Sequence, residues 1–375
     1  MPEEYFGINS INILERILRA HNPKKVFLVC GKKSFTISGA DKKIKPFFRK
    51  LSYVTFNPSP NPKIEDIEKG ISLFKITEPD MVIAVGGGSI IDSAKAINVL
   101  SMEDGDPFQY IVGEKRIKNR GKTLIAIPIT SGTGSESTKF ATIYVDKKKK
   151  SLEDEKIIPD ITIIDPSLTF SLPPYITAYT GLDTLCQAIE SYWSIKSTKT
   201  SRKYAKEALM LAYNNIEGAV KNYIPSRIAM AKASHLSGKA INISKTTACH
   251  SVSYPLTAYF GIPHGHAVSL TMPSFLEFNW LVDGKNCNDS RGVNFVKERL
   301  SEILSIMGVK DGAEAKEKFS DLLNNILEKT RLRDFGIDHK DLEMLLKESF
   351  TPNRMNNNPR KVSEEDLRKV LEEIW

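Results

Sequence analysis

Short apolar segments that run directly into turns of small residues dominate the first half of this chain. Three such segments are each followed by a turn rich in glycine, serine or threonine: residues 26–30, 81–85 and 124–128. Apolar residues with helical spacing lie between them, at 64–76 and 90–100. Continuous apolar strands that alternate with helices indicate a parallel sheet covered on both faces. Such sheets bind ligands beyond the carboxyl ends of their strands, where these turns lie.

The second half of the chain has a different pattern. A last apolar segment at 161–164 is followed by proline-containing turns, and strand patterns then nearly vanish. Helical spacing dominates six later segments: 178–193, 201–220, 227–243, 293–307, 313–330 and 364–374. We therefore place a boundary near Ser167 and predict two domains that each bury a core. They are an α/β dinucleotide-binding domain over 1–167 and an all-helical domain over 168–375.

Composition excludes several classes of partner. The chain of 375 residues has a net charge of +8, with dispersed lysines, and we expect the lysine run at 147–150 to form a solvated turn. Aromatic residues are not interleaved with basic ones, so we expect no nucleic-acid partner. No apolar run reaches the roughly 18–20 residues that span a membrane, so we expect no membrane partner. Four scattered cysteines and a polar N-terminus indicate reduced thiols in the cytoplasm.

Two of the turns carry residue types that suit a dinucleotide. Glycines would let the backbone approach a pyrophosphate, and the following helix would direct its amides at the anion, at Gly86, Gly87, Gly88 and Ser89. The next turn offers hydroxyl groups between glycines, at Thr130, Ser131, Thr133 and Ser135. Asp92 and Lys95 follow the first turn on its helix, where an exposed ion pair is the alternative interpretation.

Three residues from separate segments could bind a divalent metal. Two imidazoles and one carboxylate, from His250, His264 and Asp183, are sufficient for a site with an open coordination position. The spacing leaves other interpretations open, because His264 could lie in a turn and Asp183 could be a charge in the first turn of a helix. A nucleotide site together with an open metal site indicates hydride transfer at a polarised carbonyl.

Five motifs then identify a family resemblance: GGGSIID-AK, PITSGTGSE, IIDPSLTFSLPP, GLDTL-AIE and CH…YPL…IPHG. In this order, over nearly the whole chain, they resemble the iron-containing (group III) alcohol dehydrogenases. The resemblance implies a dehydroquinate synthase-like fold, a nicotinamide cofactor and a bound metal. It implies a pyrophosphate loop at 86–89 and nicotinamide contacts from Thr130 and Ser131. Asp92 and Lys95 would lie beside the nicotinamide, and Asp183, His250 and His264 would be metal ligands.

Two departures from the family pattern are visible. Gln187 stands where the family often has a fourth histidine ligand, and Tyr254 stands where it usually has a histidine before Pro-Leu. The first change leaves an Asp-His-His set that resembles that of the related glycerol dehydrogenases, which weakens the case for iron and makes zinc a second candidate. The second places a phenol near the reacting carbon, where it could relay a proton or simply pack against Pro255. With the segment RMNNNPR, these departures resemble the phosphonoacetaldehyde reductase (hydroxyethylphosphonate dehydrogenase) branch.

The resemblance implies a small anionic aldehyde as substrate. Arg354 in RMNNNPR is suited to bind a phosphonate, and the neighbouring asparagines could complete its oxygen shell; a solvated loop is the alternative. The turn Gly31-Lys32-Lys33-Ser34 has two cations and no acid, so we expect NADPH in preference to NADH, although a basic surface turn would look the same. A homodimer is the candidate assembly.

Three other functions remain open. A dehydroquinate synthase-like lyase would share the fold, the nucleotide and a two-histidine metal site, and it would also take an anionic substrate. A general short-chain alcohol dehydrogenase would share everything except the anion site. A non-catalytic nucleotide-binding protein would show no turnover with any aldehyde.

Overall fold

The computed structural model describes residues 2–49, 51–146 and 148–375, and it divides the chain into two compact units, 1–172 and 173–375. The first unit is built on a six-stranded sheet in which every pairing is parallel. The strands follow the order β1 (Glu3–Phe6), β8 (Ile161–Ile164), β5 (Thr123–Pro128), β4 (Met81–Gly86), β2 (Lys25–Cys30) and β3 (Ser52–Phe56). The parallel sheet predicted from the apolar segments is confirmed.

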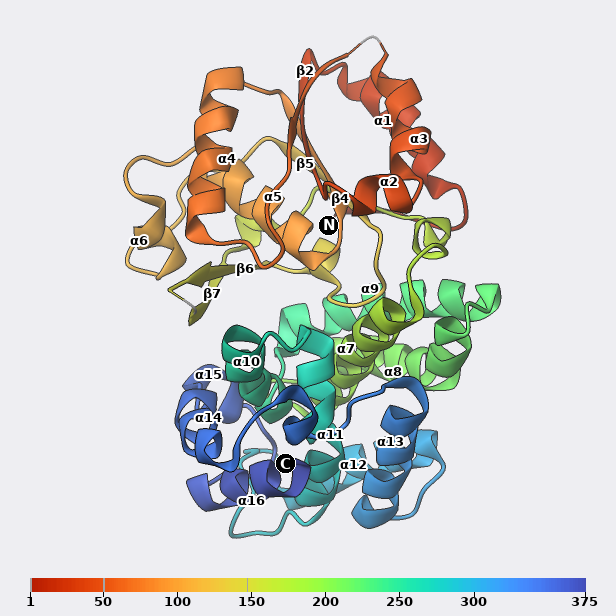
Figure 1. Ribbon diagram of the computed structural model, residues 1–375, viewed down its shortest axis with the longest axis vertical. Helices are drawn as coiled ribbons and strands as arrows, with labels where there is room; N and C mark the ends of the chain where they lie inside the picture. The colour runs from red at the N-terminus through yellow and green to blue at the C-terminus, as the bar shows by residue number, and fades with distance from the viewer. Residues whose placement is uncertain (1, 50, 147) are drawn as a thin grey trace. The chain divides into compact units, whose positions relative to one another are not determined.

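Helices cover both faces of this sheet (Figure 1). Val26 and Leu28 of β2 pack under α1 (Ile13–His21), α2 (Ser34–Ile37) and α3 (Ala40–Ile44). Phe27 and Val29 point to the opposite face, under α4 (Ile64–Thr77) and α5 (Gly88–Leu100). Successive side chains of a strand alternate between the two faces, so a strand buried on both must be apolar throughout. A short helix, α6 (Pro107–Ile111), completes this layer.

The lysine run is the clearest error of the sequence-based assignment. We expected a turn at 147–150, but Lys148 begins the strand β7 (Lys148–Glu153), which pairs antiparallel with β6 (Phe140–Val145). Ile143 and Leu152 of this hairpin are buried in the core beside α5. The apolar contacts of these two residues hold the hairpin, and Lys150 pairs with Ile143 in its register. Lys147 lies outside the described residues.

The second unit contains helices and short connections (Figure 1). Its first three helices, α7 (Pro174–Trp193), α8 (Lys199–Val220) and α9 (Ile224–Ser244), pack on one another. The others are α10 (Ala248–Phe260), α11 (His264–Trp280), α12 (Val293–Met307), α13 (Gly312–Ile326), α14 (Leu342–Ser349), α15 (Pro352–Met355) and α16 (Glu364–Ile374). The all-helical architecture is therefore confirmed. Patterns alone missed α10, α11, α14 and α15; α10 and α11 each contain an internal proline, Pro255 and Pro273.

Two further expectations can be compared with the structure. All four cysteines are free thiols, as expected; Cys30, Cys186 and Cys249 are buried, and Cys287 is half-buried. Among the described residues, no helix is long and apolar enough to cross a membrane.

Candidate active site

The structure brings Asp183, His250 and His264 together within the second unit. One ligand atom from each lies within 4.8 Å of the other two. His250 Nε2 is 3.4 Å from Asp183 Oδ1, and His264 Nε2 is 4.0 Å from the same oxygen. Within the described residues, His250 Nε2 is buried without a hydrogen-bond partner. A buried imidazole nitrogen that faces a carboxylate and a second imidazole fits a divalent metal.

Three helices position these side chains. Asp183 lies in the middle of α7, so the interpretation as a first-turn charge is wrong. His264 is the first residue of α11 rather than part of a turn, and the Gly261 turn before it has a positive φ of 69°. Gln187 lies one turn after Asp183, and its Oε1 accepts a hydrogen bond from Ser237 Oγ at 3.0 Å. That oxygen is engaged by α9, so we retain a three-residue ligand set.

Glu190 is a part of this site that our sequence reasoning missed. Its carboxylate is fully buried, and Oε2 is hydrogen-bonded to Nδ1 of His250. Burial opposes a charged imidazole, but the carboxylates of Glu190 and Asp183 outweigh it and raise the pKa of His250 to about 9. The signal was present in GLDTLCQAIE: two acids seven residues apart lie on one face of a helix.

Tyr254 and Arg354 lie next to the cluster. The ring of Tyr254 stacks beside that of His264, with centroids 6.2 Å apart. Arg354 Nε donates a hydrogen bond to Tyr254 Oη at 3.1 Å. Ser251 on α10 holds the start of the segment that carries Arg354, since its Oγ donates to Ser349 O at 2.5 Å and contacts Thr351 Oγ1. A phenol and a guanidinium therefore lie beside the cluster of Asp183, His250 and His264.

In the first unit, the two glycine turns pack against each other. The turn at 86–89 follows β4 and the turn at 130–135 follows β5, and these strands are neighbours in the sheet. A Cβ on Gly88 would come within 2.7 Å of Thr133, and a Cβ on Gly87 within 3.3 Å of Thr130. The glycines thus allow this close packing at the N-terminus of α5, a helix end that favours anions.

Comparison with known proteins assigns the family. Residues 2–166 match the family described as iron-containing alcohol dehydrogenase, and residues 177–375 match the C-terminal part of the Fe-containing alcohol dehydrogenase family. The chain belongs to the iron-containing alcohol dehydrogenases. It is 32% identical to phosphonoacetaldehyde reductase of Streptomyces viridochromogenes over 311 residues, covering 78% of this chain and 76% of that protein.

Two further relatives resemble this alcohol dehydrogenase. Sulfoacetaldehyde reductase of Bilophila wadsworthia is 32% identical over 316 residues, covering 83% of this chain and 81% of that protein. The crystal structure of sulfoacetaldehyde reductase from Bifidobacterium kashiwanohense in complex with NAD+ superposes with a TM-score of 0.89. It is 28% identical, covering 100% of this chain and 96% of that one. An oxidoreductase acting on alcohol and aldehyde groups is therefore established.

Lys95 of this alcohol dehydrogenase has a different environment from the one expected. Its amine is fully buried and donates hydrogen bonds to Thr138 O at 2.8 Å and Phe140 O at 2.9 Å. The exposed ion pair disagrees with this enclosure, because the side chain of Lys95 is fully buried beside Asp92. Its place beside the nicotinamide stays a prediction. Burial lowers its pKa to about 8, although Asp92 and Glu136 oppose the shift. Its partners belong to the segment that leads from the second turn into β6.

Asp92 and Ser135 belong to the same cluster. Ser135 Oγ donates to Asp92 Oδ1 and accepts from Lys95 Nζ at 3.2 Å, while Asp92 Oδ2 accepts from Thr142 N at 2.8 Å. The side chain of Asp92 is 14% exposed, and burial raises its pKa while Lys95 opposes the rise. The hydroxyl of Ser135 thus fastens the second turn to α5, and its contact with the cofactor stays a prediction.

The segment RMNNNPR is packed rather than solvated. Asn357 Nδ2 donates to Ser244 O and Thr246 O, both at 2.9 Å, and Asn358 Nδ2 donates to Asn279 Oδ1 at 2.7 Å. The guanidinium of Arg360 stacks on Phe278 at 3.9 Å. Two of the three asparagine amides that we expected around an anion are therefore committed to the protein interior. Arg354, from the same segment, is instead hydrogen-bonded to Tyr254.

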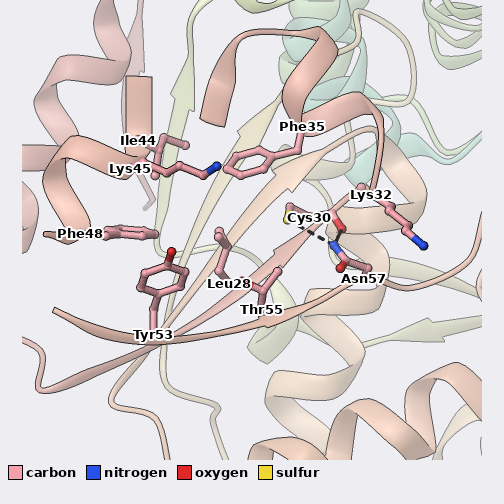
Figure 2. A pocket seen from close by; sticks show the side chains of 11 residues that line it. Leu28, Cys30, Lys32, Phe35, Ile44, Lys45, Phe48, Tyr53, Thr55 and Asn57 are labelled. Atoms are coloured by element: carbon pink, nitrogen blue, oxygen red, sulfur yellow. Dashed lines mark hydrogen bonds between the residues drawn. The ribbon is translucent and has the colours of Figure 1, made fainter. Parts of the chain in front are cut away.

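Gly31 and Lys32, from the turn of residues 31–34, border a cavity of about 220 Å³ near the carboxyl ends of β2 and β3. Figure 2 shows Phe35, Phe48 and Tyr53 around this space, with Lys45 reaching its edge beside Phe35. Lys32 lies near Asn57, and its side chain points away from the aromatic rings (Figure 2). Lys32 and Lys33 are both exposed, and Ser34 is half-buried. The cavity and the cations suit an aromatic ring that carries a phosphate nearby.

Proposed function

We propose that this enzyme reduces a small anionic aldehyde, with phosphonoacetaldehyde, which would give 2-hydroxyethylphosphonate, as the favoured substrate. The hydrogen bond of Arg354 to Tyr254, beside the metal cluster, is the observation that carries this proposal. Both curated relatives described above bear the names of reductases for short aldehydes with an anionic group. Their names suggest the substrate class but do not identify the substrate of this chain.

Asp183, His250 and His264 would hold a divalent metal, Fe2+ or Zn2+. Nitrogen and carboxylate donors suit both ions, and the family description favours iron. The bound metal would act as a Lewis acid on the carbonyl oxygen.

Arg354 would bind the anionic end of the substrate. Its Nε is oriented by Tyr254, and the guanidinium makes no other hydrogen bond to the described part of the chain. The terminal nitrogens can therefore form the paired hydrogen bonds that phosphonate oxygens accept. An arginine held by a single orienting bond presents this fork at lower entropic cost than a free side chain.

Tyr254 is the proposed proton donor to the alcohol oxygen. Its hydroxyl oxygen accepts the N–H of a cation, and such a bond stabilises the oxygen after its proton has left. A tyrosine can thus take the place of the histidine that the family usually has here.

The proposed cofactor is NADPH, which would supply the hydride. The pyrophosphate would bind at the N-terminus of α5, where Gly87, Gly88 and Ser89 are half-exposed. Lys32 and Lys33 would accept the 2′-phosphate. The solved sulfoacetaldehyde reductase binds NAD+, so the preference for NADPH rests on the two lysines alone.

A general short-chain alcohol dehydrogenase is the second candidate, because the hydrogen bond between Arg354 and Tyr254 could serve only to hold α10 and α15 together. The family assignment removes the lyase and the non-catalytic alternatives.

NADPH oxidation by the metal-reconstituted enzyme should be measured with phosphonoacetaldehyde, sulfoacetaldehyde and butanal. We expect the anionic aldehydes to have the higher kcat/KM. A preference for butanal would contradict the proposed substrate and leave the general activity.

A further inference from the structure

The carboxylate of Glu190 is among the most enclosed charges of the second unit. It projects from α7 and is fully buried. Oε1 accepts hydrogen bonds from Thr247 N at 3.1 Å, Thr247 Oγ1 at 2.7 Å, Cys249 N at 2.9 Å and His250 N at 3.4 Å. These donors lie at the N-terminus of α10, so one oxygen of Glu190 serves as the cap of that helix.

The other oxygen of Glu190 has a different partner. Oε2 faces Nδ1 of His250, while His250 Nε2 faces Asp183 Oδ1. A neutral imidazole carries one proton, and the nitrogen that lacks it is the one that can bind a metal. A carboxylate can only accept, so Oε2 retains the proton on Nδ1 and leaves the lone pair on Nε2.

We propose that Glu190 is a positioning residue that selects the His250 tautomer able to bind the metal through Nε2. This inference rests on the proposed metal site, because it gives Glu190 a role only if His250 is a ligand. A carboxylate behind a histidine ligand fixes the orientation of the ring and increases the basicity of the ligand. The same carboxylate ties the ligand to the start of α10, so ring orientation and helix position are set together.

A purely structural role for Glu190 predicts a different result, and Glu190→Gln separates the two. The glutamine side chain has nearly the same shape, and its amide oxygen can still accept the hydrogen bonds at the start of α10. Its amide nitrogen would then face Nδ1 and donate a proton. That contact favours the tautomer with the proton on Nε2, where it blocks the metal. The hydrogen bonds that cap α10 would be retained, and metal affinity would be lost.

The experiment measures Co2+ affinity of the apoenzyme by competition with a chelator, together with the visible spectrum of bound Co2+ and the melting temperature. We expect Glu190→Gln to remain folded and to bind Co2+ at least tenfold more weakly than wild type, with an altered spectrum. Thr247→Val is the matched control. It removes one bond to Oε1 without touching Oε2, so it should lower the melting temperature and retain Co2+ affinity.

Wild-type affinity in Glu190→Gln would overturn the inference while leaving the metal site intact. If wild type and His264→Ala bind Co2+ equally weakly, the result contradicts the proposed metal site and, with it, the role of Glu190. Should Glu190→Gln not fold, nitrogen NMR of the Zn2+-loaded wild type decides. A protonated Nδ1 and a metal-bound Nε2 on His250 are expected, and metal bound through Nδ1 would overturn the proposal.

Discussion

Gly265 lies directly against the carbonyl oxygen of Tyr179. A Cβ on Gly265 would come within 1.9 Å of that oxygen and within 2.7 Å of the Cβ of Asp183. Helix α11 therefore approaches α7 closely where each contributes a proposed metal ligand, and only glycine permits this distance. Backbone atoms form part of the contact, so the crossing cannot be relieved by a change of rotamer.

We predict that Gly265→Ala moves His264 away from Asp183. The added methyl group overpacks the helix crossing, so the free energy of unfolding should fall by about 1–3 kcal/mol. Metal affinity should fall as well, measured by chelator competition. Gly284→Ala is the control, since a Cβ there meets no atom within 4 Å. Unchanged metal affinity in Gly265→Ala would show that the close approach does not position His264.

His250→Ala should abolish turnover and leave cofactor binding nearly intact. Removal of one of three ligands lowers metal affinity and carbonyl polarisation together, whereas the glycine turns lie in the first unit. Metal content, NADPH oxidation and NADPH fluorescence titration check this. His339→Ala, an exposed histidine, serves as the control. Stoichiometric metal and more than a few per cent of activity in His250→Ala would disprove the ligand assignment.

Arg354→Ala should raise the KM for phosphonoacetaldehyde far more than the KM for butanal. The loss of a charge-assisted pair corresponds to roughly tenfold or more in binding, and a group that binds ground state and transition state equally appears in KM. Steady-state kinetics with both aldehydes provide the measurement. Arg354→Lys should recover part of the loss. Small, equal effects on the two aldehydes would exclude Arg354 from the substrate site.

Replacement of Lys32 and Lys33 by alanine should reduce the preference for NADPH. Two exposed cations near a 2′-phosphate favour the phosphorylated cofactor by roughly tenfold, and NADH lacks this group. The ratio of kcat/KM for the two cofactors should fall, with kcat/KM for NADH nearly unchanged. The exposed Lys69→Ala is the control. A wild-type enzyme that prefers NADH would refute the cofactor proposal before any variant is made.

The burial of Lys95 predicts a pH dependence of stability. The folded-state pKa of about 8 is lower than the ordinary value of 10.5, so between these values the unfolded chain binds more protons. The free energy of unfolding should therefore rise with pH in this window, by about 2 kcal/mol between pH 8 and 10. Urea unfolding of wild type and Lys95→Met should show this gain in wild type only. Lys69→Met should show the same rise in the free energy of unfolding as wild type. An equal dependence on pH in wild type and Lys95→Met would contradict the lowered pKa of Lys95.

The sequence predicted the elements whose burial leaves a periodic pattern. The strands at 81–85 and 124–128 and six helices of the second unit, α7, α8, α9, α12, α13 and α16, follow from runs of apolar residues, which local spacing makes visible. The edge strands β1 and β3 and the strand β7 were missed, because partly exposed strands have no such pattern. Residue types also predicted the set of Asp183, His250 and His264, which the structure brings together.

What only the tertiary structure decided is which distant residues touch. The contact of Glu190 with His250 depends on how α7 meets α10, and the enclosure of Lys95 depends on where the chain leads into β6. Arg354 and the asparagines beside it look alike as hydrogen-bonding residues in the sequence, but Arg354 faces Tyr254 while Asn357 and Asn358 are buried in structural bonds. Local spacing determines which face of an element is buried. The partner of a buried polar group depends on how helices that are far apart in the chain cross one another. A single close approach, such as that of Gly265 to Tyr179, can fix the position of such a crossing.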